Sequence, residues 1–263
     1  MLHTSFSRLF WVSSVLLWSS ALSLPIAAGS ISPQESITSA DLQARYPNTE
    51  ILSLKASDDS ILALHKKSMA PFTRGTFILL PDGSRHAAIG NIIDPLREEM
   101  VDQGWDTLSV MMPSYDGMSG EDADKTYLAQ LKSRIDAAIA QAKQQPGAIV
   151  ILAQGHSGAL INQLLQQNQI ETPQALILIG ATLRDPSADL AAIQAMSQHK
   201  VPTLDILQYS DGDSALNSLR ARVQWTRKQV KDLYRQRYWP EDSYRNDPWL
   251  QKEVIGWLRF IGF

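Results

Sequence analysis

The sequence predicts an α/β fold with a mainly parallel sheet, helices on both of its faces and an antiparallel hairpin at its start. Two observations carry this prediction. From residue 76 onward, short apolar runs of strand length alternate with stretches of helical periodicity, which is the pattern of a parallel sheet. In the middle of the chain, the apolar run 148–153 passes through a tight turn, Gly155-His156-Ser157-Gly158-Ala159, directly into a helix.

The start of the chain has the composition of a secretory signal peptide over residues 1–28. Arg8 supplies the positive charge, Leu9–Leu24 is mostly apolar, and small residues follow at Ala27 and Ala28. The alternative is an uncleaved membrane anchor, for which the apolar stretch is short. We interpret residues 29–49 as a polar arm with one short helix, and residues 50–263 as a single domain.

The remaining elements follow from apolar patterns and from the Gly and Pro residues that end them. We expect a hairpin of strands at 50–55 and 60–66, then strands at 76–80, 106–112, 148–153, 175–179 and 202–208. We expect helices from Asp94 to Gly104, around 128–142, at 160–165, at 187–198, from Ser214 to about Tyr234, and at 250–258, with 236–246 as strand or loop.

Composition excludes several classes of function. The chain has 263 residues, no cysteine and a net charge of −3. It therefore has no disulfide, no cysteine metal site and no thiol nucleophile, and the mild charge argues against a general nucleic-acid binder. An exported chain without disulfides fits the bacterial periplasm. The sequence has no cluster of metal ligands and no nucleotide-binding loop, so we predict no metal and no cofactor.

The turn around Ser157 resembles a nucleophile elbow of the form G-x-S-x-G, with Ala159 at the fifth position. A serine on a sharp turn needs small neighbours, and Gly155 and Gly158 provide them. We predict Ser157 as the nucleophile. The N–H of Gly158 and an N–H from the loop that contains Asp82 and Gly83 would form the oxyanion hole.

A serine hydrolase also needs an acid and a base, in the chain order serine, acid, histidine. Asp211 directly follows the strand 202–208 and is the first choice for the acid, with Asp213 the second. Both residues are equally typical of a turn, Ser210-Asp211-Gly212-Asp213. No histidine follows Asp213. We predict His86 as the base, because its loop leaves the sheet at the same edge as the elbow; the alternative is a loop histidine with local hydrogen bonds.

Two further features concern charge. The run Arg220–Arg237 is basic but broken by an apolar stripe, so we interpret it as a solvated helix face, with an anionic partner as the alternative. Asp205 stands inside the apolar strand Thr203–Leu207. A buried carboxylate needs a partner, so we expect an arginine from a neighbouring element to pair with it.

Several motifs together resemble a family of exported bacterial α/β-hydrolase-like proteins of unknown function. They are Arg74-Gly75 to Leu80, Pro95-Leu96-Arg97, Gly104 to Ser109 with Met112-Pro113, Gly155 to Ala159, Pro202 to Asp205, Tyr234-Arg235-Gln236 and Gly256-Trp257-Leu258. The resemblance implies an α/β-hydrolase fold and a periplasmic or envelope setting. In similar proteins the serine position can be glycine, and a histidine often precedes the last helix, where this chain has Ser243.

Two functions are compatible with these residues. The first is a serine carboxylesterase of low activity that uses Ser157 on an acyl ester or another small molecule. The second is a catalytically silent pseudo-hydrolase that binds a ligand or an envelope protein through the same cleft.

Overall fold

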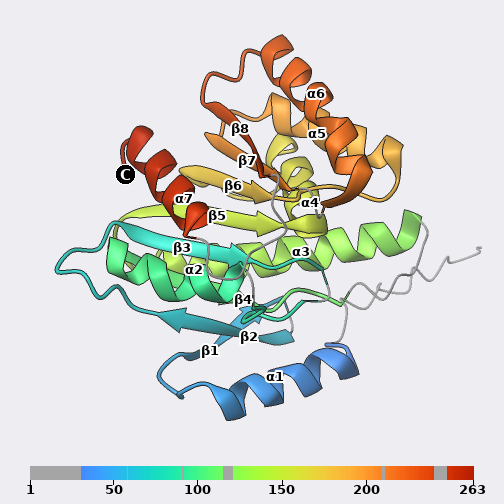
Figure 1. The fold of residues 1–263 in the computed structure, drawn as a ribbon. Helices are drawn as coiled ribbons and strands as arrows, with labels where there is room; N and C mark the ends of the chain where they lie inside the picture. Colours follow the sequence, from blue (N-terminus) through green and yellow to red (C-terminus); the bar gives the residue numbers. More distant parts are fainter. Residues whose placement is uncertain are drawn as a thin grey trace, which may run out of the picture.

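In the computed structural model, the described residues are 31–57, 59–83, 85–90, 92–114, 121–208, 211–239 and 248–263. Eight strands in this part of the chain form one sheet in the order β1-β2-β4-β3-β5-β6-β7-β8 (Figure 1). The pairs β1–β2 and β2–β4 are antiparallel, and every other neighbouring pair is parallel. The predicted fold class, a mainly parallel sheet opened by an antiparallel hairpin, is confirmed.

The first seven strands lie close to the predicted positions, and β8 falls partly in 236–246, for which the sequence leaves strand or loop open. They are β1 (Ile51–Ala56), β2 (Asp59–Lys66), β3 (Gly75–Leu80), β4 (Trp105–Val110), β5 (Ala148–Gln154), β6 (Ala175–Ile179), β7 (Thr203–Gln208) and β8 (Tyr234–Trp239). All residues of β3, β4, β6 and β7 are buried, as expected for strands that are covered on both faces.

Helices cover both faces of the sheet (Figure 1). They are α1 (Pro33–Arg45), α2 (Ile93–Glu99) with the 3₁₀ turn η1 (Met100–Gln103), α3 (Glu121–Ala142), α4 (Gly155–Gln166), α5 (Pro186–Gln198), α6 (Gly212–Lys228) and α7 (Trp249–Phe260). Side chains of α3, α4 and α5 share one apolar core with the sheet, and those of α2 and α7 share a second core on the opposite face. The helix expected in the polar arm is α1.

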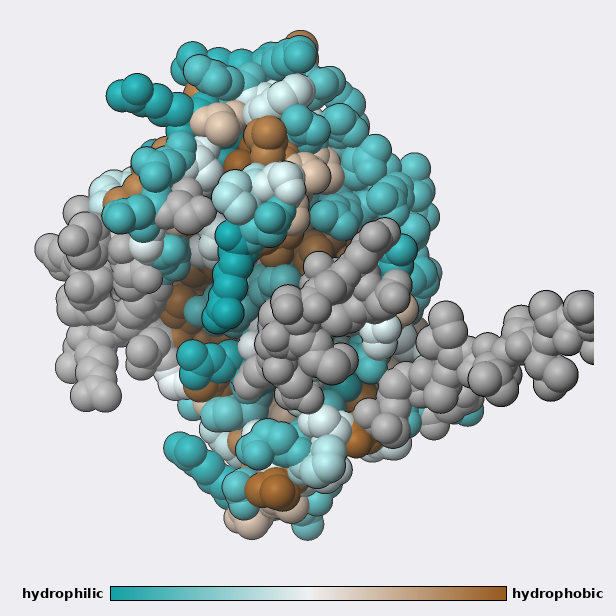
Figure 2. Space-filling model, turned by 90° about the vertical axis from the view of Figure 1, so that its right-hand side faces the viewer, coloured by the Kyte–Doolittle hydropathy of each residue, from teal (hydrophilic) through white to brown (hydrophobic). Residues whose placement is uncertain are grey.

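The parallel strands place their carboxyl ends at one edge of the sheet. This edge lies on the right-hand side of Figure 1 and faces the viewer in Figure 2, where hydrophilic side chains cover most of the described surface. Groups that leave different strands meet there, so this is the edge at which a site is expected. The predicted signal peptide lies outside the described residues, and no described helix is long and apolar enough to cross a bilayer.

One helix is shorter than predicted. The sequence pattern extends α6 to about Tyr234, but the helix ends at Lys228 and Val230 has a φ of +50°. Val230 and Leu233, which the pattern assigns to the apolar stripe, are 68% and 45% exposed. The reason is the capping arrangement after Lys228: the N–H of Lys231 donates to the Thr226 carbonyl, and that of Val230 to the Arg227 carbonyl.

Candidate functional site

The turn between β5 and α4 has its vertex at Gly155. Strand β5 ends at Gln154 and helix α4 begins at the next residue, where φ is +56°. The sequence predicts Ser157 as the vertex of this turn, and this prediction is wrong. A left-handed backbone angle is favourable for glycine because glycine has no Cβ, so the vertex falls on Gly155 and Ser157 follows within the first helical turn.

Ser157 is buried and points into the protein. Its exposure is 0%, and its Oγ lies 3.2 Å from the hydroxyl oxygen of Tyr127 on α3. Gly158, the second predicted small residue, serves packing: a Cβ there would lie 2.8 Å from the Ala153 carbonyl oxygen and 3.0 Å from the Ala181 Cβ. The serine therefore stands where α4 packs closely on the sheet, and not at the exposed position that a nucleophile needs.

The carboxylate of Asp82, which follows β3, occupies the vertex. Its Oδ1 accepts hydrogen bonds from the backbone N–H groups of His156 (2.7 Å) and Gly83 (2.8 Å). In an α/β-hydrolase, the residue after the nucleophile and the loop after this strand supply the two N–H groups of the oxyanion hole. A Cβ on Gly155 would lie 2.3 Å from Asp82 Oδ1. The aspartate thus fills both the oxyanion hole and the space of a nucleophilic side chain.

A second carboxylate, Asp211, lies at the same edge. Its Oδ2 accepts the backbone N–H of Gln208 at 2.7 Å, and its Oδ1 would lie 2.5 Å from a Cβ on Gly180 at the end of β6. The pKa of Asp211 is raised to about 6, mainly by burial; the Gln208 hydrogen bond and the Arg222 charge lower it, and the negative charges of Asp205 and Asp82 raise it. The alternative acid, Asp213, is exposed at the start of α6.

His86 makes its contacts elsewhere. Its Nδ1 accepts the backbone N–H of Ala88 at 3.2 Å. Burial lowers its pKa, and the neighbouring Arg45 of α1 lowers it further, while Asp94 of α2 has the opposite effect. The described part of the chain contains no hydrogen bond between His86 and Ser157. The stretch with Ser243, which the family resemblance aligns with the usual histidine, lies outside the described residues.

The other described histidines have partners or neighbours of their own. His65 Nε2 lies 3.8 Å from Asp106, and the ring of His156 packs edge-on against Tyr127 with 5.1 Å between ring centroids. His199 Nε2 lies 3.1 Å from Asn162 Oδ1. No group of three or more histidine, aspartate or glutamate side chains in the described part of the chain could hold a metal ion.

Beneath the edge, Asp205 has the arginine partner that the sequence predicts. Asp205 is fully buried, and Arg222 of α6 donates from Nη1 to both of its oxygens, at 3.1 and 3.2 Å. Arg222 Nη2 also donates to the Ala181 carbonyl, and the Tyr234 hydroxyl donates to Asp205 Oδ2 at 2.7 Å. The predicted ion pair is confirmed.

The arrangement has two carboxylates at the strand ends and no nucleophile at the vertex. Asp82, Gly83, Gly155 and Asp211 come together, as the sequence predicts, whereas Ser157 lies beneath them. The sequence also matches the elbow pattern two residues earlier, in Ala153-Gln154-Gly155-His156-Ser157, where Gly155 is the vertex. In this earlier match too, the outer residues, Ala153 and Ser157, are small.

Comparisons with known proteins agree with this architecture. A family model described as "Protein of unknown function (DUF3530)" matches residues 24–120 and 117–260. No curated protein matches the chain. Among solved structures, esterase 2 of Thermogutta terrifontis has a TM-score of 0.61 at 13% identity, with 84% of this chain and 98% of that chain covered.

Two further structures are similar to the same degree. Est1E from Butyrivibrio proteoclasticus has a TM-score of 0.59 at 14% identity and covers 81% of this chain and 97% of its own. A dienelactone hydrolase from Anabaena variabilis has a TM-score of 0.57 at 13% identity, with 80% and 96% covered. At such low identity these likenesses establish the α/β-hydrolase fold and nothing about activity.

Proposed function

The chain belongs to the DUF3530 family of proteins of unknown function and has an α/β-hydrolase-like fold, and we propose that it is a catalytically silent hydrolase-like protein that binds a ligand or a partner in the cell envelope. One observation carries the proposal: the Asp82 carboxylate accepts the two N–H groups that would otherwise stabilise a substrate oxyanion.

Acyl transfer needs these N–H groups free. Loss of one such donor slows a serine hydrolase about 100- to 1000-fold. Here both donors are occupied, and the occupying group is a carboxylate, which repels any developing oxyanion. Gly155 also leaves the vertex without a hydroxyl. Each of these three features alone opposes hydrolysis, and they reinforce one another.

The same groups favour a different kind of ligand. Asp82 and Asp211 give the carboxyl edge two hydrogen-bond acceptors and negative charge. A molecule that binds there is therefore expected to present hydrogen-bond donors or a positive charge instead of an acyl ester.

The periplasm is the proposed location, on the basis of the N-terminal signal. The intact mass of the exported protein tests this proposal, because the mature chain should start near Gly29 or Ser30.

Labelling with a fluorophosphonate tests the proposed silence. We expect the purified protein to remain unlabelled over a wide pH range, because Ser157 is buried and Asp82 occupies the oxyanion hole. The esterase from Thermogutta terrifontis, solved as a tabun adduct, is a suitable positive control. Labelling of the wild-type protein that disappears in Ser157→Ala would instead support the second candidate, a carboxylesterase acting through Ser157.

A further inference from the structure

Strand β8 is the last strand of the sheet and offers an unpaired edge in the described part of the chain. The N–H of Thr203 in β7 donates to the Leu233 carbonyl at 2.8 Å, and the two strands are parallel with Thr203 opposite Tyr234. In a parallel ladder with this register, every second residue of β8 directs its backbone N–H and C=O groups away from β7. The peptide groups of Tyr234, Gln236 and Tyr238 therefore point away from β7.

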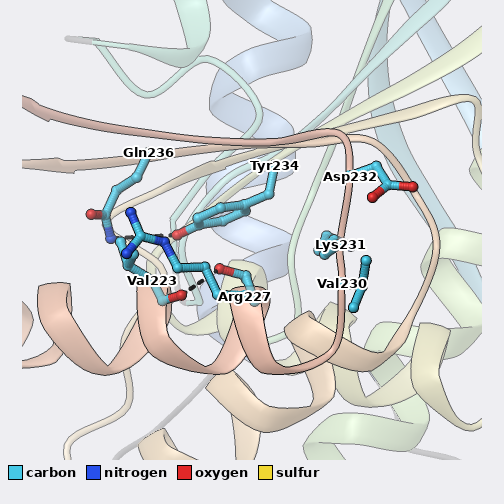
Figure 3. Close-up of a pocket in the computed structure, with 8 residues that line it drawn as sticks. Val223, Arg227, Val230, Lys231, Asp232, Tyr234 and Gln236 are labelled. Carbon is cyan, nitrogen blue, oxygen red and sulfur yellow. Dashed lines mark hydrogen bonds between the residues drawn. The ribbon is translucent and has the colours of Figure 1, made fainter.

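A groove of about 400 Å³ runs beside this edge, between β8 and the last turns of α6. Its apolar part comes from Val223 and Val230, and its polar part includes Arg227 and Gln236. Figure 3 shows Arg227 extending from α6 toward β8, where Tyr234 and Gln236 face the helix. A strand added to β8 would direct every second side chain into this groove.

Val230 at the rim of the groove has a strained backbone. It takes the left-handed position after α6, with φ of +50°, where glycine is usual and a β-branched residue is unfavourable. Its side chain gains little from burial in return, since it is 68% exposed. An exposed apolar side chain in a strained position, beside a groove, indicates that the side chain serves a contact outside the fold.

The charge along the β8 edge is positive, although the whole chain has a net charge of −3. On the groove side, exposed Arg227 has no ion pair among the described residues. On the opposite face of β8, toward α7, Arg235 and Arg237 share the single carboxylate of Glu253, at 3.8 and 2.7 Å. Asp232 is the acidic residue in the lining. This charge disfavours pairing with the β8 of a second copy and favours an acidic segment.

Lys231 also lines the groove, but its charge is already engaged. Its Nζ donates to the His199 carbonyl at 2.6 Å and lies 3.2 Å from His199 Nδ1. The positive charge that is available to a binding partner therefore comes from the arginines.

We propose that the edge of β8 and the groove beside α6 bind an extended acidic segment of another protein, which pairs with β8 as an additional strand. The outward peptide groups provide the main-chain hydrogen bonds, Val223 and Val230 receive the side chains on the groove side, and the arginines select for carboxylates. This surface is separate from the elbow, so the inference stands whether or not the elbow is silent.

Fluorescence anisotropy with a labelled peptide of alternating glutamate and valine tests the proposal on the exported full-length protein at low salt. We expect saturable binding that weakens as salt increases. Tyr238→Pro removes an outward N–H and should weaken binding about fivefold or more, the effect of one lost hydrogen bond. Tyr238→Ala keeps that N–H and is the matched control, which should bind nearly as tightly as the wild type.

Three more variants, at two positions, separate recognition from folding. Arg227→Gln should weaken binding about two- to fivefold while Arg227→Lys retains most of it. Val230→Gly should raise the melting temperature, because it relieves the left-handed strain, and yet weaken binding. A merely damaged fold would not give this opposite pair of effects.

Four results would overturn the proposal. They are the absence of binding by the glutamate peptide, equal binding of a peptide with lysine in place of glutamate, equal effects of proline and alanine at position 238, and a dimer of the wild-type protein that Tyr238→Pro abolishes. The last result would show that a second copy occupies the edge.

Discussion

At the scale of single residues, the vertex of the elbow is Gly155, and the carboxylate of Asp82 lies against it. Asp82 accepts hydrogen bonds from two backbone N–H groups at the vertex. Asp211 accepts one such hydrogen bond, from Gln208, and burial is the main cause that raises its pKa to about 6. Of the two carboxylates at this edge, Asp211 is therefore the one that burial makes costly to ionise.

Asp211→Asn should stabilise the protein at neutral pH. The ordinary pKa of the carboxyl is 3.8 and the folded value is about 6, so the folded state holds its proton more tightly and the free energy of unfolding falls as pH rises between these values. The amide still accepts the Gln208 N–H but carries no charge. We expect a gain of about 1–2 kcal/mol at pH 7, discounted for partial exposure.

Urea unfolding at several pH values measures this effect. The gain should vanish below about pH 4, where Asp211 is protonated in both states. Asp213→Asn, at an exposed position on the same helix, should leave stability unchanged at every pH. A destabilised Asp211→Asn at pH 7 would show that the ionised carboxylate supports the fold.

The location of this site could be predicted from the sequence, but its register could not. Both Gly155-His156-Ser157-Gly158-Ala159 and Ala153-Gln154-Gly155-His156-Ser157 place small residues around a turn. Only the backbone angle at Gly155 decides between them. The role of Asp82 could not be predicted either, because its carboxylate accepts a hydrogen bond from a backbone N–H that lies 74 residues further along the chain.

At the scale of elements, Asp205 and Arg222 join β7, α6, β8 and the loop after β6. Arg222 donates to Asp205, to Ser218 Oγ and to the Ala181 carbonyl, and Tyr234 of β8 donates to Asp205. Burial, followed by the adjacent Asp205 charge, raises the pKa of Tyr234 well above its ordinary 10.0, so the hydroxyl keeps its proton and remains a donor. The position of α6 depends on this network.

Removal of one member of the Asp205–Arg222 pair should therefore destabilise the protein strongly. We expect Asp205→Ala to lower the free energy of unfolding by about 3–5 kcal/mol, because it leaves the Arg222 charge buried and unpaired. The double variant Asp205→Leu with Arg222→Met removes both charges and should be much less destabilised than Asp205→Ala. Chemical denaturation measures both. An unchanged melting temperature for Asp205→Ala would show that the pair contributes nothing to stability.

The elements themselves were largely predictable, because periodicity reports burial directly. The end of α6 was not. Val230 and Leu233 continue the apolar spacing of the helix, yet the capping hydrogen bonds of Val230 and Lys231 turn the chain away after Lys228. A valine in a glycine position gives no sequence signal for a helix end.

At the scale of the whole molecule, one buried chain of hydrogen bonds connects the elbow helix with the groove. Asn162 of α4 donates to the carbonyls of Gly158 and Ala159 and lies beside His199 Nε2. Lys231, which lines the groove, donates to the carbonyl of the same histidine. Burial, followed by the charge of Lys231, lowers the pKa of His199 to about 3, so the imidazole is neutral in the folded protein.

This histidine should make the protein sensitive to acid. Unfolded His199 takes up a proton near its ordinary pKa of 6.5, whereas the folded protein takes it up only near pH 3. Between these values the unfolded state binds more protons, so the free energy of unfolding falls as pH falls, by at most about 5 kcal/mol from this residue. His199→Gln cannot titrate and should flatten the slope of stability against pH in this range, whatever it costs at pH 7.

Urea denaturation from pH 7 down to about pH 4 measures that slope, and His86→Gln is the matched control at a less buried position. Because His86 is more exposed, its replacement should change the slope less than the replacement of His199 does. If His199→Gln and the wild type lost stability at the same rate on acidification, the acid sensitivity would have to come from other groups, and His199 would be shown to titrate near its ordinary pKa in the folded protein.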